Sequence, residues 1–104
     1  MNKKELLGKR IRELRKRKGF SQEKLSELVN VDPTTISNIE NGKNYPSLAN
    51  LENISSILDE TFMSIFDFEH KNKPDDLIVQ INQKLQENPQ KVEGFYKIIM
   101  ALTK

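Results

Sequence analysis

The sequence has 104 residues, 36% of them hydrophobic and 31% charged, and no cysteine, which suits one small helical domain with an appendage. This composition excludes a disordered tract, a disulfide framework and a thiolate site, and no segment predicts a membrane span or a signal peptide, so we expect a cytoplasmic protein. Residues 1–43 hold eleven Lys and Arg against six Asp and Glu, whereas residues 44–104 hold six against nine. The basic front half is where we expect a polyanion to bind, although solvated helix faces explain the charge equally well.

The first two predicted helices span residues 3–18 and 22–29, and no stretch alternates for long enough to indicate a strand. Gly19 is suited to end the first helix, and Asn30 to end the second in the left-handed conformation. Ser21 is a good N-cap for the second helix. The positions expected to face the core are Leu7, Ile11, Leu14, Leu25, Leu28 and Val29.

The third predicted helix spans residues 33–41 and has an unusual surface. Asp32 is its expected N-cap, Pro33 occupies the first helical position, where its missing N–H costs nothing, and Gly42 follows the last turn. The expected core positions are Ile36 and Ile39. Five further positions are short, polar and uncharged, where an ordinary surface helix carries Lys and Glu: Thr34, Thr35, Ser37, Asn38 and Asn41.

Two further helices complete the predicted domain, one after the N-cap Ser47 and a short one over residues 62–66. Their expected apolar positions are Leu48, Leu51, Ile54, Ile57, Leu58, Phe62, Ile65 and Phe66. A polar stretch, residues 67–74, predicts a domain boundary. We therefore expect a domain over residues 1–67 and a C-terminal extension over residues 75–104.

The extension contains two amphipathic helices, residues 75–87 and 89–102, the second capped by Asn88, which can pack as an antiparallel hairpin. Two short helices have more apolar surface here than they can hide from water. We expect a second subunit to cover it in a two-fold dimer, and packing onto the fourth and fifth helices of the same chain is the alternative. The residues expected at the dimer interface are Phe95, Ile98, Ile99 and Leu102.

The segment SQEKLSELVNVDPTTISNIENGKNYPS, residues 21–47, resembles the helix-turn-helix core of the phage-repressor or Xre-type (Cro-like) family. The matching features are the initial Ser-Gln, Leu25, the turn around Asn30, and the Ile-Glu-Asn-Gly sequence that ends at Gly42. The resemblance covers about residues 5–66, and the remaining tail matches no family pattern. It implies an all-α protein, with a five-helix helix-turn-helix domain followed by a two-helix extension, that binds double-stranded DNA and regulates transcription.

The resemblance places the third helix in the major groove, where short polar side chains approach the bases closely. The implied base-contacting residues are Thr34, Thr35, Ser37 and Asn38. The implied phosphate contacts are Gln22, Asn41, Lys43 and Asn44. A solvated polar face is the plain alternative for all of them. Pro33 stands where relatives often have a polar groove residue, which puts a direct contact from this position in doubt.

The resemblance also implies an internal ion pair between Arg15 and Glu40 that fixes the angle of the third helix, with a phosphate contact by Arg15 as the alternative. His70, the single histidine, has no neighbouring ligand residues and is expected to be a plain linker residue. The sequence contains no Gly-rich phosphate loop, no metal-ligand set and no nucleophile–base pair. We therefore expect no enzymatic activity, no metal and no cofactor.

Two functions remain open from the sequence. The first is a homodimeric transcriptional regulator, expected to be a repressor, that binds a palindromic operator. The second is an antitoxin or protein-interaction regulator whose C-terminal helices capture a partner protein, with the DNA-binding domain used for autoregulation.

Overall fold

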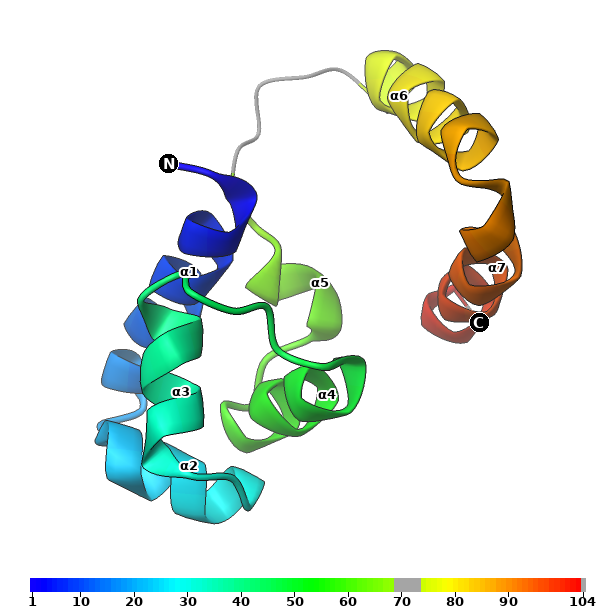
Figure 1. Cartoon of the computed structure of the whole chain (residues 1–104). Helices are drawn as coiled ribbons and strands as arrows, with labels where there is room; N and C mark the ends of the chain where they lie inside the picture. The colour runs from blue at the N-terminus through cyan, green and yellow to red at the C-terminus, as the bar shows by residue number, and fades with distance from the viewer. Residues whose placement is uncertain (69–73, 104) are drawn as a thin grey trace. The chain divides into compact units, whose positions relative to one another are not determined.

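The computed structural model of the chain describes residues 1–68 and 74–103, and all regular structure within those ranges is helical (Figure 1). The elements are α1 (Lys3–Arg17), α2 (Gln22–Val29), α3 (Pro33–Glu40), α4 (Leu48–Ile57), α5 (Phe62–Ile65), α6 (Pro74–Glu87), a 3-10 turn η1 (Pro89–Lys91) and α7 (Val92–Leu102). The predicted all-α fold, with five helices and then two, is confirmed. The chain divides into two compact units, residues 1–70 and 71–104. His70 lies outside the described residues.

The first unit encloses one apolar core to which all five of its helices contribute. In Figure 1, α3 lies beside α1, and α4 and α5 lie across the core from them. The buried apolar side chains are Leu7, Ile11, Leu14, Leu25, Val29, Ile36, Ile39, Leu51, Ile54, Leu58 and Ile65. Phe68 also packs against this core, one residue beyond the predicted limit of the domain.

The helix ends follow mostly from local signals. The hydroxyl oxygens of Ser21, Ser47 and Thr61 accept hydrogen bonds from the first turns of α2, α4 and α5. Asp32 occupies the N-cap position of α3, but the prediction that its side chain caps this helix is wrong. The N–H of Thr35 bonds instead to the backbone carbonyl of Asp32, at 2.9 Å.

Three residues predicted to face the core are exposed: Leu28 (40%), Leu48 (47%) and Phe66 (43%). On α2 the buried stripe runs through Leu25, Ser26 and Val29, so the small Ser26 takes the place expected for Leu28. Ser26 is tolerated there because its hydroxyl donates to the carbonyl of Glu23 at 2.7 Å.

The second unit consists of α6, η1 and α7, and none of its described residues is buried. Asn88 occupies the N-cap position of the 3-10 turn η1, which precedes α7, but the prediction that its side chain caps the last helix is wrong. Its side-chain amide donates backwards to the carbonyl of Lys84 at 2.8 Å, so it closes the end of α6. None of the described helices combines the length and apolar character needed to cross a membrane.

Candidate nucleic-acid interface

The N-terminal ends of α2 and α3 border an open hollow of about 580 Å³ on the surface of the first unit. It is lined by Arg15, Ser21, Gln22, Glu23, Pro33, Thr34 and Ser37. The two helices meet here because Asn30 turns the chain in the left-handed conformation (φ 65°) at the end of α2. The structure thus brings Gln22, expected to contact phosphate, beside Thr34 and Ser37, expected to contact bases.

The outward face of α3 is polar, and its side chains form few hydrogen bonds with other described residues. Thr34 is exposed and Asn38 is half-buried, and neither side chain forms a hydrogen bond with any residue of the described part of the chain. Ser37 is also half-buried, and its hydroxyl accepts a bond of 3.3 Å from the amide of Asn41. Thr35 lies half-buried at the edge of this face. The groups best placed to bond an incoming ligand are therefore those of Thr34 and Asn38.

A buried network joins α1 and α2 to the end of α3. Arg15 Nε lies 2.7 Å from Glu40 Oε2, and Arg15 Nη2 donates to Glu40 Oε1 at 3.0 Å. Arg15 and Glu40 are only 7% and 5% exposed. Arg15 Nη1 donates to the carbonyl oxygen of Phe20 at 2.7 Å. The two residues expected to pair therefore do so with bidentate geometry, and the guanidinium points into the protein.

Gln22 belongs to the same network, which its sequence position did not reveal. Its Nε2 donates to Glu40 Oε1 at 3.0 Å. A primary amide has two donor hydrogens, so one remains for a phosphate oxygen. The bond to Glu40 holds the amide at the rim of the hollow.

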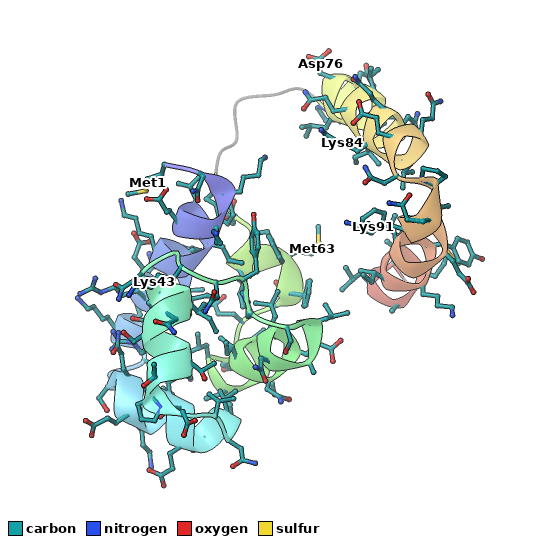
Figure 2. The ribbon with its side chains drawn as sticks, in the orientation of Figure 1. Met1, Lys43, Met63, Asp76, Lys84 and Lys91 are labelled. Carbon is teal, nitrogen blue, oxygen red and sulfur yellow. The ribbon has the colours of Figure 1, made fainter. Side chains whose placement is uncertain are left out.

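The loop after α3 presents the other residues expected to contact phosphate. Asn41, Lys43 and Asn44 are exposed, and Figure 2 labels Lys43 just past α3. The backbone N–H groups of Lys43 and Asn44 bond to the carbonyl of Asn38 at 2.9 and 3.4 Å. The loop starts at Gly42, whose φ of 73° favours glycine. These bonds hold the loop against the last turn of α3.

Gly8, whose role the sequence did not reveal, sets how closely α1 approaches α3. A Cβ added to Gly8 would collide with the backbone carbonyl of Ile39 and would lie 2.9 Å from that of Glu40. An isolated glycine inside a predicted helix is the signal that would have marked this position. The end of α3 therefore rests directly on the backbone of α1.

The sequence of this interface matches a known family. The family model described as Helix-turn-helix (HTH_3) matches residues 11–63, about half of the chain. The chain belongs to the HTH_3 family. This is the Xre or phage-repressor type, a family of DNA-binding transcriptional regulators, which are not enzymes, so the predicted family is confirmed.

Two curated relatives illustrate the similarity of this HTH_3 chain to regulators. The HTH-type transcriptional regulator SinR of Bacillus subtilis is 35% identical over 71 residues, which cover 67% of this chain and 64% of SinR. The chain thus spans somewhat less than two thirds of SinR. The control protein C.MunI of a Mycoplasma species is 43% identical over 60 residues, 57% of this chain and 81% of that protein.

Solved structures of the same kind share the fold. The restriction-modification controller protein C.AhdI from Aeromonas hydrophila superposes with a TM-score of 0.57 at 34% identity, over 59% of this chain and 92% of that one. A chain of the SinR protein/SinI protein complex superposes with a TM-score of 0.58 at 25% identity, over 91% of this chain and 98% of that one.

Proposed function

We propose that this HTH_3 regulator reads its DNA site with the outward face of α3, through Thr34, Thr35, Ser37 and Asn38. The observation that carries the proposal is the polar, uncharged surface of α3, where Thr34 and Asn38 have no bonding partner among the described residues. A helix that enters the major groove needs short polar side chains to reach the base edges. The carboxamide of Asn38 suits adenine, and the methyl group of Thr34 suits thymine.

Backbone phosphates flanking this groove would be held by Gln22 before α3 and by the loop after it. The loop residues in this role are Asn41, Lys43 and Asn44. Contacts of this kind set the position and register of the protein but do not select a sequence. Selection of bound sequences from random DNA tests the whole arrangement, because it shows the preferred site, its symmetry and its half-site spacing.

Asn38→Ala should cost about 1–3 kcal/mol of binding free energy on the selected site and relax the preference at one base position. Unfolding should change little, because the Asn38 side chain has no internal hydrogen bond to another described residue. Fluorescence anisotropy on selected and random duplexes measures the first effect, and Asn53→Ala, at an exposed site on α4, is the matched control. Equal weakening on both duplexes would refute a role in base recognition.

We propose further that the regulator binds a palindromic operator as a homodimer and represses transcription, with the second unit as the dimerisation element. Large apolar side chains along α6 and α7 are exposed, among them Ile78 (54%), Ile81 (53%) and Ile99 (47%). A second copy of the same helices supplies an apolar cover by two-fold symmetry. Paired recognition helices would then reach half-sites about 34 Å apart, one turn of the duplex.

Truncation after Phe68 should leave a folded monomer that binds a half-site weakly and gains little from a full palindrome. The first unit keeps its whole core in this variant, because every buried apolar side chain precedes residue 68. Ile98→Glu with Leu102→Glu should have the same effect in the full chain, because it places charges in an apolar interface. Analytical ultracentrifugation measures the oligomeric state of the full chain and of both variants. A truncated chain that still dimerises would contradict this role of the second unit.

A second candidate function is the capture of another protein by the C-terminal helices. One observation favours it: a similar chain belongs to the solved SinR protein/SinI protein complex, and that superposition covers 91% of this chain. The exposed apolar side chains of α6 and α7 would then meet a different polypeptide. A full-length protein that remains monomeric at micromolar concentration would favour this function over the homodimer.

A further inference from the structure

The positive charge of the first unit is concentrated on α1, whereas the two helices proposed to touch DNA carry a single cation, Lys24. Residues 3–17, which form α1, hold eight Lys and Arg against two Glu. Residues 21–42, which contain α2 and α3, hold one Lys against four Asp and Glu. Glu40 is neutralised by Arg15, but Glu23, Glu27 and Asp32 would repel phosphates. Attraction to DNA therefore has to come mainly from outside the α2–α3 pair.

Several cations of α1, and one just beyond it, are bonded within the first unit. Arg15 is bound to Glu40, Arg10 Nε donates to a backbone carbonyl of α5 at 3.1 Å, and Lys18, just past α1, lies 3.9 Å from the carboxylate of Asp59. These three cations are therefore already paired within the first unit. Three other cations of α1, which line one hollow of the surface, are exposed and form no hydrogen bond or ion pair with any residue in the described ranges: Lys9, Arg12 and Lys16.

The free cations share one face of α1, because Lys9, Arg12 and Lys16 are spaced i, i+3 and i+7. They border a hollow of about 360 Å³ whose other wall includes Glu40 and Asn41, at the end of α3. Figure 1 shows α1 running beside α3, and Figure 2 shows nitrogen-tipped side chains projecting outward from α1. The free cations thus lie next to Asn41, one of the proposed phosphate contacts.

We propose that Lys9, Arg12 and Lys16, here called the α1 ridge, form a second phosphate-binding surface on the DNA backbone beside the groove that α3 enters. This inference rests on the proposed function, since it assumes that α3 faces DNA. Long side chains with free cationic ends suit phosphate oxygens, and each such contact releases counterions and steepens the salt dependence of binding. The positive charge of the α1 ridge offsets the repulsion between the DNA phosphates and the acidic side chains of α2 and the α2–α3 turn.

The test compares the full chain with its K9Q/R12Q/K16Q variant on a fluorescent duplex of random sequence, because phosphate contacts do not depend on sequence. The slope of log affinity against log salt should become shallower by about 0.9 for each phosphate that the variant no longer neutralises, about two to three in all. Affinity should fall by a similar factor on the selected operator. The K84Q/K91Q/K97Q variant removes the same charge from exposed sites of the second unit and should keep the wild-type slope.

Glu13 provides a test of opposite sign, because its carboxylate lines the same hollow as the α1 ridge. Glu13→Gln should raise affinity for the random duplex, whereas Glu52→Gln, an equal change on the exposed surface of α4, should not. Circular dichroism and urea denaturation check that each variant folds.

A triple variant with the wild-type salt slope and affinity would overturn the α1 ridge. If Asn38→Ala still relaxed base preference in that case, the proposed function would stand without the ridge. A wild-type protein that selects no sequence and binds no duplex would overturn both. A shallower slope in the triple variant, together with a gain from Glu13→Gln, supports the ridge.

Discussion

Glu40→Ala should lower the free energy of unfolding by about 3–5 kcal/mol, because removing one partner of a buried ion pair leaves the other charge without compensation. Arg15 is 7% exposed and donates two N–H groups to this carboxylate, at 2.7 and 3.0 Å. Gln22 donates a third bond at 3.0 Å. The variant therefore leaves a buried guanidinium without its carboxylate partner and an amide without its acceptor.

A double-mutant cycle in urea measures this coupling. Arg15→Ala should also destabilise the fold, and the Arg15→Ala/Glu40→Ala double variant should lose clearly less than the sum of the single losses. Lys18→Ala is a useful control, because its pair with Asp59 spans 3.9 Å at an exposed site and should contribute about 1 kcal/mol at most. Strict additivity of the two single effects would argue against the network.

The Arg15–Glu40 ion pair is also expected to orient α3, the helix proposed to contact the bases. Glu40 is the last residue of α3, whereas Arg15 is held by α1. Loss of either should weaken DNA binding under conditions where the variant remains folded. If Arg15 contacted phosphate instead, Arg15→Ala would reduce the salt slope and Glu40→Ala would not.

Gly8→Ala should destabilise the first unit by about 1–3 kcal/mol or more, even though alanine is the better helix former by about 1 kcal/mol. The added methyl group would collide with the carbonyl of Ile39 and lie 2.9 Å from that of Glu40. Both contacts are with backbone atoms of α3, which cannot move away by a change of rotamer as a side chain can. To make room, α3 has to move away from α1, and the proposed base contacts move with it.

Gly94→Ala is the matched control for this prediction. A Cβ at Gly94, inside α7, meets no atom within 4 Å, so the substitution should raise the stability of its helix by up to about 1 kcal/mol. Urea or thermal denaturation of both variants, followed by circular dichroism, shows whether the two effects have opposite signs. A Gly8→Ala protein as stable as the wild type would disprove the close approach.

The sequence was sufficient for the features of this protein that depend on neighbouring residues. Helical periodicity predicted α1 to α7 within a few residues, because apolar side chains recur at helical spacing along the longer helices. Ser21 and Ser47 cap their helices, and Asn30 takes a left-handed conformation as predicted, because a cap involves only the first or last turn. The polar surface of α3 was also visible, since it is a property of eight consecutive residues.

Tertiary structure decided the features that depend on contacts between distant segments. Periodicity did not distinguish Leu28 from Ser26, because burial depends on where neighbouring helices end and on a local hydroxyl bond. The bond from Gln22 to Glu40 joins residues 18 positions apart. The contact of Gly8 with the end of α3 is likewise set by the packing of two helices. A pattern of residue types records which side of a helix is apolar, but the distance and angle between two helices follow from the packing of all the side chains between them.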